Sequence, residues 1–425
     1  MPIQSSGVIQ SYMYKPNRVS SLLKRTLLMA FNFRPYLLVV VLTPAISFSQ
    51  TITRLDNSKI TSAELDNKVE QLMKDGNVHG LAITVFNKEK PVYKKVFGYK
   101  RFDTKEPLQT NTNFYGASLS KVVFAVLVMK MVEEKVIELD KPLESYLPQP
   151  VYAYGKGSSW GQDFTSLQGD SLYKKITARM CLDHSTGFPN WRWYEPDQKL
   201  HVHFEPGSGY SYSGEGLCYL QFVLEKLTAK SLEQLMEEKI FQPLGMTTSA
   251  YFWQPRFEKN YCYGHDTNGK VLEKDKDNAP RSASTLETTP DDLSLFLEAV
   301  LQQRILAAAS YEEMFTPQLR LRSKIQMEAQ SWLDTTNTEN DKIQLSYGLG
   351  WGILQTPYGF GAFKEGHGDG FQHYSIIFPE KQMGILIMTN SDNGEGIFKE
   401  LLEVAIADRY TPWRWQNYIP YNQKK

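Results

Sequence analysis

An unbroken apolar run at residues 122–129 is the feature that most constrains the fold of this chain. The run lies inside a mostly apolar stretch at residues 114–134, whose length favours a buried helix over a strand. A helix that is apolar on all sides has to be covered by other elements. The chain has 425 residues, 41% of them hydrophobic and 22% charged, so it can build a core large enough to do this.

Segments near both ends of the chain have strand patterns. Two alternating segments at residues 79–98 flank Asn87-Lys88-Glu89-Lys90, which is typical of a hairpin. Strand-length apolar runs follow at residues 350–353, 374–378 and 384–389, and helical periodicity is found at residues 62–74, 215–238 and 398–407. We therefore expect one sheet built from both ends of the chain, flanked by helices, with a mainly helical subdomain at about residues 140–285 inserted.

The N-terminal segment predicts export. Lys24 and Arg25 precede a short apolar run at residues 36–42, and Ser47 and Ser49 supply the small residues that a signal peptidase reads. We expect cleavage near Gln50, with residues 1–49 as signal peptide and upstream segment and residues 50–425 as one domain. The run is shorter than the roughly 20 residues of a membrane span, so the mature protein is expected to be secreted or periplasmic without a stable span.

Charge and cysteine content exclude several kinds of partner and cofactor. Lys and Arg together number 47, as do Asp and Glu, so the formal net charge is zero and a nucleic-acid partner is not expected. The three cysteines, Cys181, Cys218 and Cys262, have no C-x-x-C spacing of the kind that zinc sites and redox pairs use. The phosphate-binding loop G-x-x-x-x-G-K-[ST] and the zinc motif H-E-x-x-H are both missing from the sequence.

Ser-x-x-Lys occurs three times, and its context selects one copy. Ser21 to Lys24 lies in the export segment, and Ser171 to Lys174 lies in an irregular region at residues 149–174 that is expected to be a long loop. Ser118 instead stands at the start of the buried helix, with Lys121 on the same face one turn later. The copy at Ser118 is therefore the candidate for chemistry.

Ser118 and Lys121 together have the properties of a nucleophile with its own base. A helix N-terminus favours a developing oxyanion at the serine, and burial of a lysine in an apolar helix favours the neutral amine, which can accept a proton. The alternative is a capping serine followed by a lysine whose ammonium reaches out to solvent.

The segment Phe114-Tyr115-Gly116-Ala117-Ser118-Leu119-Ser120-Lys121 resembles the active-site motif of the serine β-lactamase and penicillin-binding-protein superfamily, in its class C, DD-peptidase and esterase branch. The likeness continues in order through Asp183-His184-Ser185-Thr186-Gly187, Pro243-Leu244-Gly245-Met246 and Tyr347-Gly348-Leu349-Gly350-Trp351-Gly352. It implies an α/β (α+β) fold with an antiparallel sheet, and a reaction that needs no metal or cofactor.

The resemblance implies a second motif, Tyr-x-Asn after a Pro-Gly turn. Pro206-Gly207 is followed by Tyr212, which the resemblance makes the catalytic tyrosine, but the asparagine position holds Gly214. Tyr210 offers a competing register that also lacks the asparagine. A lysine ammonium nearby would favour the phenolate and make Tyr212 a general base.

The third motif of the family is Lys-Thr-Gly or His-x-Gly on a strand. His367 in Gly366-His367-Gly368-Asp369-Gly370 fits the second form, with Asp369 where glycine is usual. The resemblance implies that His367 hydrogen-bonds a substrate carboxylate or steadies the tyrosine, and that a backbone N–H near Gly370 completes the oxyanion hole with that of Ser118. The alternative for this glycine-rich segment is a tight turn only.

Two further groups of residues have a weaker claim to a function. His201, His203 and Glu205 alternate and would form a metal set if they lay on one strand, but a solvated or packing role is favoured because no further ligand lies nearby in the sequence. The aromatic segment Trp191-Arg192-Trp193-Tyr194 follows a family motif and is expected either to line a substrate wall or to pack conventionally.

Taken together, the sequence predicts a serine hydrolase that forms an acyl-enzyme on an ester, amide or β-lactam carbonyl of a small-molecule or peptide substrate. Gly214 and Asp369 weaken the β-lactam choice in particular. The alternative is a catalytically weakened relative that binds a cell-wall peptide without turnover.

Overall fold

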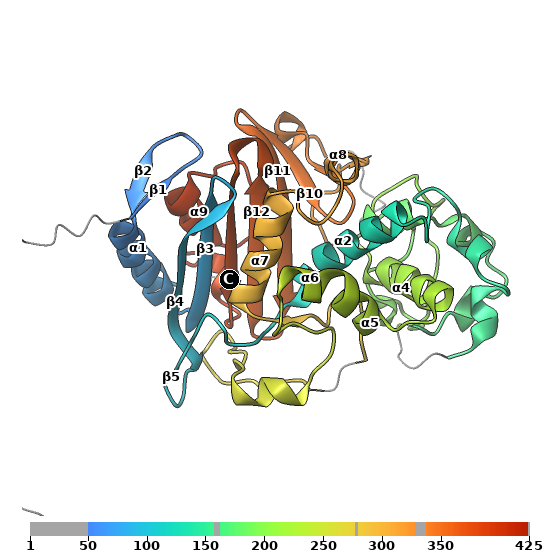
Figure 1. Ribbon diagram of the computed structural model, residues 1–425, viewed down its shortest axis with the longest axis horizontal. Coiled ribbons are helices and arrows are strands. Elements are labelled where there is room, and N and C mark those ends of the chain that lie inside the picture. Colours follow the sequence, from blue (N-terminus) through green and yellow to red (C-terminus); the bar gives the residue numbers. More distant parts are fainter. Residues whose placement is uncertain (1–49, 157–161, 277–278, 328–336, 424–425) are drawn as a thin grey trace, which may run out of the picture. The chain divides into compact units, whose positions relative to one another are not determined.

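The structure is a computed structural model that describes residues 50–156, 162–276, 279–327 and 337–423 (Figure 1). The predicted signal peptide at residues 1–49, and with it the first Ser-x-x-Lys, lies outside the described residues. In the described part of the chain, no helix combines the length and the apolar character needed to cross a membrane.

A nine-stranded antiparallel sheet forms the centre of the domain, in the order β5-β4-β3-β13-β12-β11-β10-β9-β8. The pairing of β13 with β3, with Ile387 opposite Ile83, joins the C-terminal strands to the N-terminal ones, which confirms the sheet predicted from both ends of the chain. The strands are β3 (Gly80–Asn87), β4 (Lys90–Arg101), β5 (Glu106–Pro107), β8 (Leu319–Arg320), β9 (Ser346–Tyr347), β10 (Gly352–Thr356), β11 (Gly359–Gly368), β12 (Phe371–Phe378) and β13 (Met383–Thr389).

Helices cover both faces of this sheet. On one face α1 (Ser62–Asp75) packs against α9 (Phe398–Ile406), and on the other lie α2 (Ser120–Glu133) and α7 (Pro290–Leu301) (Figure 1). Successive side chains of β3 point to opposite faces of the sheet and pack in both helical layers. Ile83 belongs to the hydrophobic cluster with α1 and α9, and Ala82 belongs to the cluster with α2. Strands buried on both faces read as continuous apolar runs, as β13 does.

Most of the remaining helices come, in sequence, between β6 (Phe114–Tyr115) and β7 (Glu287–Thr288). These two short strands pair with each other. The helix predicted at residues 215–238 is divided, because Ala229 adopts a left-handed conformation and Ser231 begins a new helix with a capping box to Gln234. The helices are α3 (Ala178–Leu182), α4 (Gly214–Thr228), α5 (Leu232–Met236) and α6 (Gln242–Leu244), with α8 (Ala308–Phe315) after β7; a further two-stranded sheet pairs β1 (Thr51–Thr53) with β2 (Lys59–Thr61).

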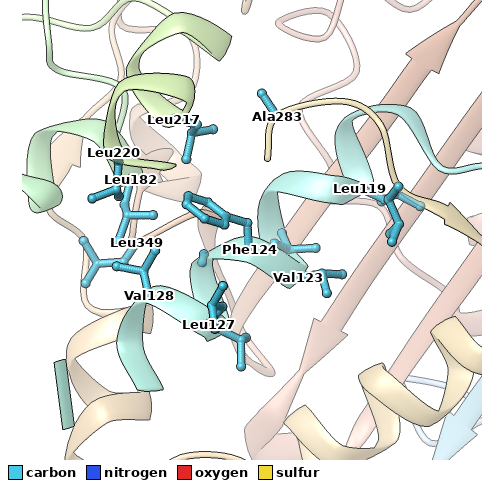
Figure 2. Packing of buried hydrophobic residues seen from close by; sticks show 14 of the residues in the cluster. Leu119, Val123, Phe124, Leu127, Val128, Leu182, Leu217, Leu220, Ala283 and Leu349 are labelled. Atoms are coloured by element: carbon cyan, nitrogen blue, oxygen red, sulfur yellow. The ribbon is translucent and has the colours of Figure 1, made fainter. Parts of the chain in front are cut away.

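Helix α2 is the buried helix that the apolar run predicts. Side chains from Val122 to Met129 are at most 1% exposed, and Figure 2 shows Phe124 and Val128 packed among leucines of α3, α4 and the loop before β10. The predicted range was too long at its start, since Phe114 and Tyr115 form β6. The apolar setting matters for function because Lys121 belongs to the first turn of this helix.

Candidate active site

Ser118 lies in a tight turn that connects β6 to α2. The turn is the 3-10 helix Ala117–Leu119, and Ala117 adopts a positive φ of 47°, which is unfavourable for a residue with a side chain. Neighbouring contacts hold this conformation: Gly116 N–H donates to Leu286 O at 2.7 Å, and Leu286 N–H donates to Ser120 Oγ at 3.0 Å. Strain held in place by buried hydrogen bonds is typical of functional turns.

Lys121 is directed at Ser118 from the first turn of α2. Its Nζ lies 2.9 Å from Ser118 Oγ and 2.7 Å from Ala283 O, and the residue is 1% exposed. Burial holds the pKa of Lys121 well below its usual value, and the nearby ammonium of Lys364 lowers it further. A neutral amine at this distance is able to accept the proton of the serine hydroxyl.

Tyr212 completes a cluster with these two residues. It is 3% exposed, Lys121 Nζ lies 4.9 Å from the centre of its ring, and the Ser118 hydroxyl is near enough to lower the pKa of the phenol. Burial raises the pKa of Tyr212, although the Lys364 ammonium acts in the opposite direction. The phenol therefore stays protonated, in contrast to the phenolate expected from a neighbouring ammonium.

His184 holds the loop that carries Tyr212. Its Nδ1 accepts the backbone N–H of Ser213 at 3.0 Å, and its ring centre lies 4.4 Å from that of Tyr212. Burial, helped by the charge of Lys364, lowers the pKa of His184 well below its usual value, so the ring is neutral and can accept that bond. His184 therefore positions the loop that carries the tyrosine.

Lys364 of β11 is a site residue that sequence reasoning missed. Its Nζ donates to Tyr212 Oη at 2.9 Å, to Glu365 O at 3.0 Å and to the Glu365 carboxylate. Burial alone would lower the pKa of Lys364, but Glu365 outweighs burial and raises it. A signal was present in the sequence, because Lys364-Glu365-Gly366 also fits Lys-x-Gly, three positions before the histidine that was chosen.

His367 lies at the same cavity but does not contact Tyr212. Its Nε2 is 3.2 Å from Glu395 Oε1, and although burial lowers its pKa, the Glu395 carboxylate outweighs burial and raises it. A cavity of about 610 Å³ contains the site and is lined by Ser118, Pro189, Asn190, Trp191, Tyr194, Glu195, Pro196, His203, Ser211, Tyr212, Met327, Glu365 and His367. His367 is thus a wall residue, while Lys364 takes the place beside the tyrosine.

Gly370 is not brought to Ser118. It lies in the turn between β11 and β12 with a φ of 73°, and its N–H donates to Asp392 Oδ1 at 2.7 Å, so the N–H is already engaged. The part of β11 that meets the serine turn is at Gly366, where a Cβ would approach Gly116 O to 3.1 Å. The segment of β11 that lies against the serine turn is therefore near Gly366, whereas the N–H of Gly370 is bound to Asp392.

Trp191 explains why residue 214 is a glycine. A Cβ at Gly214 would lie 2.3 to 2.7 Å from three atoms of the Trp191 indole, closer than side chains pack. The indole is stacked on Trp193, with ring centres 5.0 Å apart, and lies 5.7 Å from Lys121 Nζ. An aromatic ring thus occupies the space next to Lys121 that a side chain at position 214 would otherwise enter.

The substitution Gly214→Ala is expected to destabilise the protein by about 1–3 kcal/mol, since Trp191 must leave its stacked position. Urea denaturation measures the effect. Gly209→Ala is the matched control, because its Cβ would meet only Phe204, at an ordinary 3.5 Å. Equal changes in the free energy of unfolding for the two variants would contradict the packing explanation.

The histidines considered as metal ligands are paired with carboxylates. His201 Nε2 lies 3.0 Å from Asp197, and His203 Nε2 lies 2.9 Å from Glu195. Glu205 is bound instead by Lys175 at 2.7 Å. Among the residues that the structure describes, no group of three potential ligands is arranged to hold a metal ion.

Comparisons with known proteins agree with this geometry. The family model described as Beta-lactamase matches residues 65–407. A penicillin-binding protein of Bacillus subtilis (strain 168) is 22% identical over 349 residues, covering 74% of this chain and 68% of that protein. A lovastatin esterase of Penicillium rubens is 26% identical over 212 residues, which are 44% of this chain and 52% of the esterase. The octameric penicillin-binding protein homologue from Pyrococcus abyssi has a similar fold, with a TM-score of 0.65 at 20% identity over 84% of this chain and 81% of that one.

Proposed function

Since this chain belongs to the β-lactamase family, we propose that it is a serine hydrolase in which Ser118 forms an acyl-enzyme with an ester or amide carbonyl. The observation that carries the proposal is the 2.9 Å contact between the serine hydroxyl and the buried amine of Lys121. Relatives that bind penicillin or cleave an ester agree with this class of reaction.

Acylation begins with transfer of the Ser118 proton to the neutral amine of Lys121. The Oγ then forms a bond to the carbonyl carbon, and the carbonyl oxygen takes up the negative charge. We assign the stabilisation of that oxygen to the backbone N–H of Ser118 and to an N–H of β11 near Gly366, where the strand lies against the serine turn. Collapse of this intermediate breaks the bond to the leaving group and leaves an ester on Ser118.

Tyr212 supplies the proton that the leaving group needs. Its hydroxyl contacts Ser118, and its proton passes to the departing oxygen or nitrogen as the bond breaks. The phenolate that forms is stabilised by Lys364 at 2.9 Å and recovers a proton from the Lys121 ammonium. A water molecule then attacks the acyl-enzyme by the same steps in reverse, and the carboxylic acid product leaves.

The proposal is tested by labelling with a fluorophosphonate, followed by intact mass and peptide mapping. We expect one label per chain, on Ser118, together with turnover of a p-nitrophenyl ester. A chromogenic cephalosporin is assayed in parallel. Labelling without turnover of either substrate would favour the binding protein, and a failure to label folded protein would refute the proposed nucleophile.

A further inference from the structure

The charged groups of the cavity are already paired within the protein. Two carboxylates belong to the lining: Glu195 is bound by His203 at 2.9 Å, and Glu365 is bound by Lys364. His367 is paired with Glu395 at 3.2 Å. No lysine or arginine is found among the described residues of the lining. The described residues of the cavity wall therefore present no free cation to a substrate.

The two lysines beneath the cavity do not supply a cation either. An ammonium group has three N–H donors, and the three of Lys364 are used by Tyr212 Oη, the Glu365 carbonyl and the Glu365 carboxylate. The amine of Lys121 is bound to Ser118 and Ala283, and burial holds its pKa well below the usual value. A substrate carboxylate entering this cavity would lose its hydration without gaining an ionic partner.

Part of the cavity lining is apolar. The ring of Trp191 lies 5.7 Å from Lys121 Nζ, beside the reacting groups. The indole fits there because Gly214 has no side chain to occupy the same space. Pro189, Pro196 and Tyr194 continue the wall. Stacking on Trp193 keeps the indole in one orientation, so it offers a fixed flat surface next to Ser118.

We propose that the site takes uncharged esters whose acyl group is aromatic or an extended alkyl chain lying on Trp191, and that it discriminates against acyl groups that carry a carboxylate. The inference rests on the proposed function and adds to it the substrate class and Trp191 as a specificity-determining residue. Burial of an apolar acyl chain on the indole favours binding, while the missing cation disfavours its anionic counterpart.

A matched pair of substrates tests the discrimination against charge. The p-nitrophenyl ester of hexanoic acid and the mono-p-nitrophenyl ester of adipic acid have the same chain and leaving group and differ in one terminal carboxylate. We expect kcat/KM to be at least about tenfold higher for the hexanoate. Equal or faster hydrolysis of the adipate ester would overturn the inference while leaving the serine hydrolase standing, whereas hydrolysis of neither ester, together with no labelling of Ser118, would overturn both.

The role of Trp191 is tested by the length dependence of its alanine variant. In Trp191→Ala we expect kcat/KM to fall roughly 10- to 100-fold for the hexanoate but less than about threefold for p-nitrophenyl acetate, whose acyl group is too short to lie on the ring. Trp253→Ala removes a second half-buried indole that does not line the cavity, and is expected to leave both rates unchanged. Equal losses for acetate and hexanoate in Trp191→Ala would show a structural role only and overturn the assignment.

Discussion

The variant Ser118→Ala is expected to lose roughly 10⁴-fold or more in kcat/KM for any ester that the protein hydrolyses, because no other group can form the acyl-enzyme. Its free energy of unfolding should change by no more than about 1 kcal/mol, since the hydroxyl serves mainly as a partner of Lys121 and Tyr212. Steady-state kinetics and urea denaturation measure the two quantities on the same preparation.

Ser171→Ala is the matched control for this variant. Ser171 begins the other Ser-x-x-Lys in the described part of the chain, but it lies before the 3-10 turn Leu172–Lys175 and outside the lining of the cavity. This control should keep full activity and the fluorophosphonate label. Residual hydrolysis above a few per cent in folded Ser118→Ala would show that a different nucleophile performs the reaction.

Replacement of Lys364 is expected to affect stability and activity together. The variant Lys364→Met leaves the carboxylate of Glu365 buried without its cation, in a pair whose side chains are 0% and 3% exposed. Removing one partner of such a buried pair destabilises a protein by about 3–5 kcal/mol. The phenolate of Tyr212 also loses its partner at 2.9 Å, so kcat should fall by about 10²-fold or more.

The double variant Lys364→Met/Glu365→Gln separates the two effects. It removes the unpaired charge, and we expect it to regain most of the free energy of unfolding while kcat stays low. Urea denaturation and steady-state kinetics on wild type, both single variants and the double variant complete the thermodynamic cycle. Recovery of kcat along with stability would mean that Lys364 supports the fold and has no part in the reaction.

Predictions from the sequence were most accurate where one element contains all the residues concerned. The distance between Ser118 and Lys121 depends on a single turn of chain, and their contact at 2.9 Å follows from that spacing. The buried helix α2 and the sheet from both ends of the chain also follow from periodicity, since each pattern reflects its own burial.

Interpretation of the third motif depended on strand register, which sequence alone specifies weakly in a glycine-rich segment. Lys364 and His367 are both plausible on β11, and only the pairing of the strand with β12 decides that Lys364 meets Tyr212 while His367 meets Glu395. The same pairing places Gly370 in the turn between the two strands, where its N–H donates to Asp392. The sequence therefore allowed both registers, three residues apart, and only the fold decided between them.

The sequence by itself determined the helix, its nucleophile and the amine one turn away, because a helical turn fixes those positions locally. The tertiary structure alone decided which lysine supports Tyr212, that no free cation is found in the described part of the cavity lining and that Trp191 fills the space beside Gly214. These features bring together side chains more than twenty residues apart in the chain, and only packing of separate elements sets their distances.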